Sequence, residues 1–91
     1  MREVLFLHAD DNIAVCLGDV VVGHVISQDD HEIIAVGAIP RGHKIATRFI
    51  EKGAGIIKYG ERMGHATTDI AKGAHVHTHN VLGDRLSTEQ A

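Results

Sequence analysis

The sequence predicts a mainly β protein, built as one small domain of short strands with one or two short helical turns. The chain has 91 residues, 44% of them hydrophobic, which suffices for one modest core and leaves no room for a second domain. Its apolar runs are short and rich in β-branched residues, as strands are. Ten glycines disfavour long helices and suit tight corners.

Strands are expected in five apolar runs, and clusters of Asp, Asn, Gly and Pro between them supply the turns. These runs lie at residues 4–7, 13–17, 20–22, 32–36 and 55–59. Short helical turns are expected within residues 43–53 and 67–73, each ended by a glycine, Gly53 or Gly73.

A weak internal repeat occurs in the second half of the chain. Residues 41–56 and 63–76 both carry Gly-His near the start and Ile-x-Lys-Gly-Ala near the end. We therefore expect the second half to fold as two similar corners. The domain is expected to span residues 1–83, with a loosely ordered tail at residues 84–91.

The net charge of −3 is unevenly distributed along the chain. Residues 1–40 hold one basic and seven acidic side chains, whereas residues 41–91 hold eight basic and five acidic ones. The positive second half favours an anionic ligand there, although an ordinary solvated surface explains it about as well. Because the chain lacks an overall basic balance and a set of stacking aromatics, we expect no nucleic-acid partner.

The remaining composition predicts a cytoplasmic protein that does not enter a membrane. Residues 1–12 lack the apolar segment of a secretory signal, and no apolar stretch approaches the ~18 residues of a membrane helix. The single cysteine, Cys16, excludes an internal disulfide, suits a reducing compartment and is expected to pack in the core. Because the core is modest, help from a partner subunit or a second copy of the chain is expected.

Three histidines alternate along one short stretch, at His75, His77 and His79. In a strand, side chains two residues apart point to the same face, about 6.6–6.8 Å apart along the chain. Such a pair can chelate a metal ion, but the nearest carboxylates to complete a site, Asp69 and Asp84, lie on flanking segments. The alternatives are hydrogen bonding to a polyhydroxy or carboxylate substrate, and a surface without a ligand.

Two other segments place cationic groups beside glycines. His43 and Lys44 follow a glycine at an expected turn, and Lys58 and Tyr59 precede another. Together they offer the cationic donors and the hydroxyl group needed to hold a carboxylate and hydroxyls. Solvated lysines and a packed tyrosine are the alternative interpretation.

A long segment resembles a known family. Residues 39–81, IPRGHKIATRFIEKGAGIIKYGERMGHATTDIAKGAHVHTHNV, resemble the SAF-type domain of altronate and galactarate dehydratases, and the small subunit of related enzymes. The runs Gly-His-Lys, Ile-Lys-Tyr-Gly and His-x-His-Asn carry the resemblance. It implies a β-clip fold and a lyase that removes water from an anionic sugar acid, acting together with a large catalytic subunit.

The resemblance also implies which side chains face the active site: His43, Lys44, Lys58, Tyr59, His77, His79 and Asn80. His77 and His79 are the expected contacts to substrate or to a divalent metal. That metal would be iron, manganese or magnesium, held mainly by the large subunit. The general base stays unassigned. Two alternatives remain open: the small subunit of a sulfolactate sulfo-lyase, and a stand-alone carbohydrate- or sugar-acid-binding module.

Overall fold

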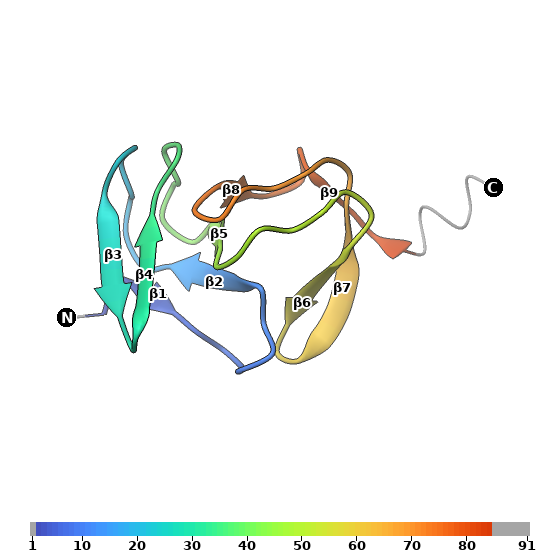
Figure 1. Ribbon diagram of the computed structural model, residues 1–91, viewed down its shortest axis with the longest axis horizontal. Coiled ribbons are helices and arrows are strands. Elements are labelled where there is room, and N and C mark those ends of the chain that lie inside the picture. Colours follow the sequence, from blue (N-terminus) through green and yellow to red (C-terminus); the bar gives the residue numbers. More distant parts are fainter. Residues whose placement is uncertain (1, 85–91) are drawn as a thin grey trace.

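The computed structural model describes residues 2–84 and shows a small protein of short β-strands (Figure 1). Nine strands follow one another: β1 (Val4–Leu5), β2 (Ile13–Cys16), β3 (Val25–Gln28), β4 (His31–Ile34), β5 (Lys44–Ala46), β6 (Gly55–Lys58), β7 (Glu61–Ala66), β8 (His75–Val76) and β9 (Val81–Leu82). The expected mainly β fold is therefore confirmed. The expected tail was residues 84–91, and all of it except Asp84 lies outside the described residues.

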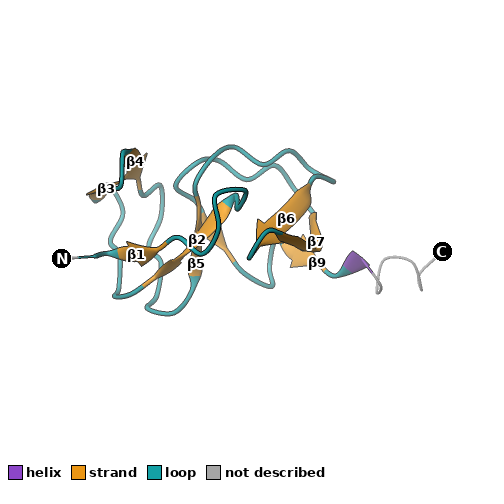
Figure 2. Cartoon of the chain, turned by 90° about the horizontal axis from the view of Figure 1, so that it is seen from below, coloured by secondary structure: helices purple, strands orange, loops and turns teal. Residues whose placement is uncertain are grey.

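The strands form three antiparallel sheets (Figure 2). A four-stranded sheet has the order β1-β2-β5-β8, a three-stranded sheet has the order β6-β7-β9, and β3 pairs with β4 alone. Each of the hairpins β3–β4 and β6–β7 turns through two residues with positive φ, Asp29–Asp30 and Tyr59–Gly60. This is the twist that two-residue hairpin loops favour.

Four corners with one design connect these strands. Each begins with a buried Val or Ile and places a glycine with positive φ three residues later; the four pairs are Val20 and Gly23, Ile39 and Gly42, Ile50 and Gly53, and Ile70 and Gly73. The branched residues form isolated antiparallel bridges in two pairs, Val20 with Ile39 and Ile50 with Ile70. The two similar corners expected in the second half are confirmed, and the first half contains another pair.

The expected helical turns are wrong. Residues 43–53 and 67–73 hold strand β5, bends and glycine turns. Ile50 and Ile70 exchange backbone N–H···O bonds of 2.8 Å, so their backbones are extended against each other. The glycines that were expected to end helices instead make the corners, because a positive φ suits glycine at a tight turn.

Strand positions also differ from expectation. Residues 13–16 and 55–58 agree well with the expected runs, whereas residues 20–22 contain only the bridge at Val20. Strands β3, β5, β7 and β9 were not expected. Strands β3 and β7 mix polar and apolar residues without a clear run, β5 was expected to be helical, and β9 has only two residues.

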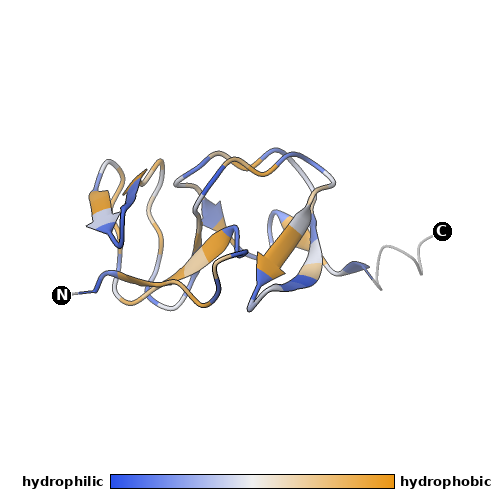
Figure 3. Cartoon of the chain, turned by 60° about the horizontal axis from the view of Figure 1, so that its bottom comes forward, coloured by the Kyte–Doolittle hydropathy of each residue, from blue (hydrophilic) through white to orange (hydrophobic). Residues whose placement is uncertain are grey.

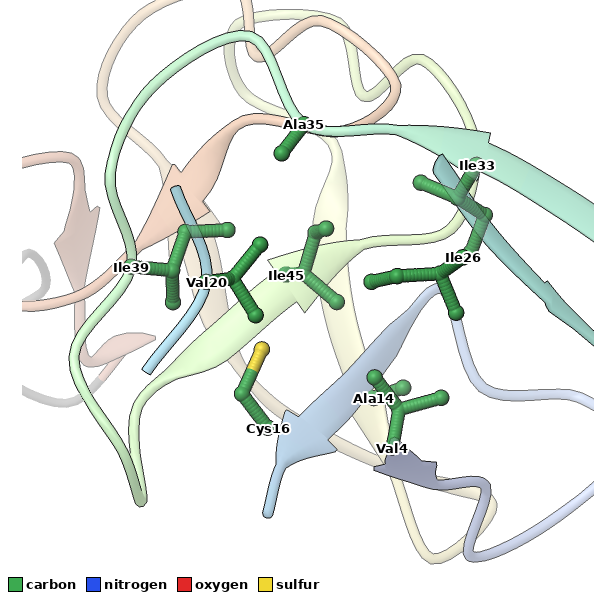
Figure 4. Close-up of a cluster of buried hydrophobic side chains, with 9 residues drawn as sticks. All are labelled: Val4, Ala14, Cys16, Val20, Ile26, Ile33, Ala35, Ile39 and Ile45. Atoms are coloured by element: carbon green, nitrogen blue, oxygen red, sulfur yellow. The ribbon is translucent and has the colours of Figure 1, made fainter. Parts of the chain in front are cut away.

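Two apolar clusters lie on either side of the β2–β5 pair. The first contains Val4, Ala14, Cys16, Val20, Ile26, Ile33, Ala35, Ile39 and Ile45 (Figure 4). The second contains Ile13, Ala46, Ile50, Ile56, Ala66, Ile70 and Val76. Neighbouring residues of β2 and β5 therefore face different clusters, and Figure 3 shows hydrophilic and hydrophobic residues alternating along the chain. Within residues 2–84, no helix is long and apolar enough to cross a membrane.

Candidate functional site

Four histidines gather where β5 and β8 pair. His75 lies in β8 opposite Ile45, and the same pairing brings His43, just before β5, next to His77. The rings of His43 and His77 stack with centroids 4.1 Å apart and an interplanar angle of 10°. His75 contacts the rings of both His43 and His79 at 5.0 Å between centroids. The histidines singled out in the sequence are thus brought together.

The reason given for their clustering was wrong. Strand β8 ends at Val76, and residues 77–80 form a turn rather than an extended strand. Asn80 makes this turn, because its side-chain Oδ1 accepts a hydrogen bond from the His77 backbone N–H at 3.0 Å and its own N–H donates to the His77 carbonyl at 3.1 Å. Stacking on His43, which strand alternation does not predict, completes the cluster.

The rings of His75 and His77 favour their neutral form. His43 Nδ1 and His75 Nε2 lie 2.8 Å apart, so one ring donates a hydrogen bond and the other accepts it. Partial burial, followed by the neighbouring histidines, lowers the pKa of His75. Partial burial also lowers the pKa of His77, together with nearby His43, Lys44 and His79. Near neutral pH these imidazoles can therefore donate or accept hydrogen bonds.

A pocket of about 270 Å³ opens beside the histidines. Its polar side chains come from four residues, Lys44, Lys58, His77 and Thr78. Its apolar walls are formed by Ile13, Ile56, Met63, Val76 and Val81. Burial lowers the pKa of Lys44, and the positive charge of Lys58 lowers it further. Two lysine side chains therefore line one mostly apolar hollow, and a bound anion would offset their positive charges.

The other expected site residues lie differently. Asn80 is 6% exposed, and its amide also donates to the His75 carbonyl at 2.9 Å, so both ends of the amide bond the backbone of its own loop. Tyr59 is 61% exposed at the tip of the β6–β7 hairpin, with the Lys58 Nζ atom 5.8 Å from its ring centroid. His79 is exposed at the edge of the cluster. Neither Tyr59 nor Asn80 lines the pocket.

The donor set does not make a metal centre by itself. Among residues 2–84, no group of three or more His, Cys, Asp or Glu side chains could hold a metal ion. The two carboxylates nearest the histidines in the sequence are already engaged: Asp69 accepts the Lys52 N–H at 2.8 Å, and Asp84 contacts Arg62 and His65. Ligands from this part of the chain thus do not complete a site around His77 and His79.

Sequence reasoning missed Asp11 and Asn12, which it treated as part of a turn. Both bond the backbone of residues 55–60, the segment that carries Lys58. It also missed Met63 and Thr78 as pocket residues. A short polar Asp-Asn pair just before a strand was the available signal, because such side chains often satisfy backbone groups of nearby segments.

The fold and the pocket define a small β domain with paired corners and a pocket lined by two lysines and His77, beside a cluster of histidines. The chain belongs to the family described as "Altronate/galactarate dehydratase SAF domain", whose model matches residues 2–84. The resemblance found in the sequence is confirmed, and the three-sheet β architecture is consistent with the expected SAF β-clip.

Individual relatives support this membership. The chain is 47% identical over 88 residues to altronate dehydratase of Escherichia coli (strain K12), covering 97% of this chain and 18% of that protein. It is 38% identical over 80 residues to altronate dehydratase of Bacillus subtilis (strain 168), covering 88% of this chain and 16% of that protein. The chain thus spans less than a fifth of these two dehydratases.

A second group of relatives has a different name. The chain is 38% identical over 84 residues to (2R)-sulfolactate sulfo-lyase subunit alpha of Chromohalobacter salexigens, covering 85% of this chain and 89% of that subunit. The same subunit of Paracoccus pantotrophus is 41% identical over 58 residues. The relatives of this chain therefore include proteins named as dehydratases and as sulfo-lyase subunits.

Proposed function

We propose that this chain is the sugar-acid-binding component of an altronate dehydratase-like hydro-lyase, contributing residues to an active site shared with a large catalytic subunit. The pocket carries this proposal, because Lys44, Lys58 and His77 converge there on one solvent-open hollow. Two lysine ammonium groups match the carboxylate of a small hydroxy acid, and the imidazole matches its hydroxyls. The names of the relatives supply the reaction class.

The chemistry of elimination needs such groups. Removing the proton next to a carboxylate builds negative charge on the carboxylate oxygens, and positively charged donors stabilise that charge. Lys44 and Lys58 provide them, and neutral His77 is able to hand on a proton. In this proposal the general base belongs to the catalytic partner. A divalent ion, iron, manganese or magnesium, is also held mainly there, with His77 and His79 as this chain's contacts.

Binding of D-altronate to the purified chain, measured by calorimetry, tests the pocket. Replacing Lys44 or Lys58 by alanine removes a charged hydrogen bond and is expected to weaken binding by about tenfold or more. Lys72→Ala is the matched control, because Lys72 is an exposed lysine that does not line the pocket. Equal affinity in all four proteins contradicts the site.

Turnover tests the shared active site. The isolated chain is expected to be inactive, and addition of a large dehydratase subunit is expected to produce a 2-keto-3-deoxy acid. The double variant His77→Ala, His79→Ala is expected to slow this turnover. Turnover unchanged by that variant would reject the site assignment. Tight sugar-acid binding without any response to the large subunit would instead identify a stand-alone binding module.

A sulfolactate sulfo-lyase subunit is the second candidate. The observation that favours it is the similarity to two sulfo-lyase alpha subunits. The pocket suits sulfolactate too, because sulfolactate carries a carboxylate and a second anionic group, which the two lysines can bind. Assaying the reconstituted pair for sulfite release against 2-keto-3-deoxy acid formation separates the two candidates.

A further inference from the structure

The segment that carries Lys58 is held in place from outside its own sheet. Strand β6 lies at the edge of the sheet β6-β7-β9. Along this edge the buried side chain of Asn12 donates from Nδ2 to the Gly55 carbonyl at 2.8 Å and accepts from the Ile57 N–H at Oδ1, at 2.9 Å. The amide thus pairs with β6 as a neighbouring strand would.

The preceding residue holds the other side of Lys58. The Asp11 carboxylate accepts the Tyr59 N–H at 3.0 Å and the Gly60 N–H at 2.8 Å. Tyr59 has a φ of 57°, in the left-handed region that non-glycine residues disfavour. Two charge-assisted hydrogen bonds offset that strain and keep the turn closed.

We propose that Asp11 and Asn12 are positioning residues of the pocket: together they clamp the backbone on both sides of Lys58 and so hold its side chain in the pocket that Lys44 also lines. The inference rests on the proposed function only where Lys58 binds the substrate carboxylate. The geometric part stands without any ligand, because Lys44 and Lys58 line the same pocket in the free chain.

A second asparagine, Asn80, makes the same pair of side-chain hydrogen bonds as Asn12. Asn80 grips the His75 carbonyl and the His77 N–H, a pair two residues apart like Gly55 and Ile57. Asn12 and Asn80 are also the two buried polar side chains found within residues 2–84. Each fixes one of the three segments that bring polar side chains to the pocket: Asn12 holds the segment of Lys58, Asn80 holds that of His77, and Lys44 lies on a third. The amides therefore act on different pocket groups.

The pKa of the Lys44 ammonium group measures the clamp directly. The charge of Lys58 holds this pKa below its ordinary value, in addition to the effect of burial. NMR titration of the lysine side chains in Lys58→Ala gives the full rise that loss of this charge produces. We expect Asp11→Ala and Asn12→Ala each to reproduce at least about half of that rise, because Lys58 moves away from Lys44.

Matched controls separate positioning from general loosening. Asp69→Ala removes an exposed carboxylate that accepts a backbone N–H, as Asp11 does, but at the Lys52 corner. Asn80→Ala removes a buried amide with the same bonding pattern as Asn12. Both controls are expected to lose stability. Asp69→Ala should leave the Lys44 pKa nearly unchanged, whereas Asn80→Ala serves only as the stability control, because Asn80 holds the His77 segment that lines the same pocket as Lys44. Because the Asp11 bonds are solvent-exposed, Asp11→Ala should fold even if Asn12→Ala does not.

Altronate affinity, measured on the same proteins, links the clamp to function. In a double-mutant cycle, Asp11→Ala is expected to weaken binding about fivefold in the parent chain and to have little effect in a Lys58→Ala background. A Lys44 pKa that does not move in either clamp variant, or that moves equally in Asp69→Ala, overturns the positioning role. A Lys44 pKa that does move, in a chain that binds no sugar acid, supports the clamp and rejects only the proposed function.

Discussion

At the scale of single residues, the site contains ionisable side chains whose surroundings disfavour their charged forms. Lys44 is half-buried against apolar walls and lies near a second lysine, and His77 stacks on another imidazole. Burial and like charge both oppose protonation, so the site gains from an anion that supplies the missing negative charge. This argues for a binding role for the residues and against an ordinary solvated surface.

Anion affinity is expected to rise as the solution is acidified below pH 6.5. The pKa values of His75 and His77 lie below their ordinary 6.5, so both rings are mostly neutral at pH 7.5 and gain protons at lower pH. A bound carboxylate favours the protonated rings. Calorimetry with D-altronate between pH 7.5 and 5 measures the change. His77→Gln is expected to reduce this pH dependence, whereas affinity that falls steadily with acidification would contradict it.

Cys16 is expected to be unreactive in the folded protein. It is fully buried in the first cluster, and burial raises the pKa of its thiol to about 11 (Figure 4). The thiolate is the reactive species, so alkylation at pH 8 should be slow until the chain unfolds. Since the chain has one cysteine, mass spectrometry after iodoacetamide treatment reports on this site alone. Rapid labelling without denaturant would show that the cluster opens readily.

At the scale of elements, the corners explain why the fold can be made from strands of two to six residues. Each corner buries one branched side chain and turns on one glycine, and the corners hydrogen-bond in pairs. Reciprocal bonds join the second pair, since the Gly53 N–H donates to the Ala66 carbonyl and the Gly73 N–H donates to the Ala46 carbonyl, both at 2.8 Å. Such pairing supplies the backbone bonds that long strands would otherwise provide.

Equivalent glycines in this pair are expected to differ in their tolerance of alanine. Gly53 and Gly73 have φ values of 88° and 89°, but a Cβ at Gly53 meets nothing within 4 Å, whereas one at Gly73 would lie 2.0 Å from the Ile34 carbonyl oxygen. Gly53→Ala should lose about 1 kcal/mol from backbone strain. Gly73→Ala should lose at least about 2 kcal/mol more, because the chain must shift. Urea unfolding measures both, and equal losses would contradict the close approach.

These elements also show what the sequence could reveal. The Ile-x-Lys-Gly-Ala repeat correctly predicted two similar corners, because each copy of the pattern forms one corner of the structure. The same glycines misled the helix prediction, since Gly53 and Gly73 follow Ile at a spacing that also suits a helix end. Whether Ile50 packs along a helix or bridges to Ile70 depends on a partner twenty residues away, which no local pattern contains.

The candidate site shows the same limit. Local alternation singled out His75, His77 and His79, and the rings do cluster, but through a turn closed by Asn80 and a stack on His43. Contacts between distant segments are also what place Lys44 and Lys58 in one pocket. The sequence could therefore predict which residues belong to the site. Their arrangement in space depends on strand pairing between distant segments.

At the scale of the whole molecule, two small clusters depend on one shared pair of strands. Strands β2 and β5 send alternate residues to either side, Ala14 and Ile45 into the first cluster and Ile13 and Ala46 into the second. The pocket lies beside the second cluster, and two residues of that cluster, Ile13 and Val76, form part of its wall. Changes in the protonation of pocket residues should therefore be felt in the stability of the whole domain.

Thermal stability is expected to fall in two separate steps as pH decreases. The lowered pKa values of His75 and His77 mean that the unfolded chain binds more protons just below pH 6.5, so stability declines from pH 6.5 down to the folded-state pKa values and then levels off. Hydrogen bonds from Arg62 and His65 lower the pKa of Asp84 below 3.8, and the stability they provide is lost only as pH falls below that value.

Circular dichroism melts from pH 8 to pH 2.5 can resolve these steps. A double variant, His75→Gln with His77→Gln, should flatten the upper step and leave the lower one, whereas Asp84→Asn should reduce the lower step alone. The sign is decisive because the histidines and the aspartate both have lowered pKa values, yet the former disfavour a charge in the folded state and the latter favours one. A melting temperature that rises between pH 7.5 and 5.5 would contradict the lowered pKa values of His75 and His77.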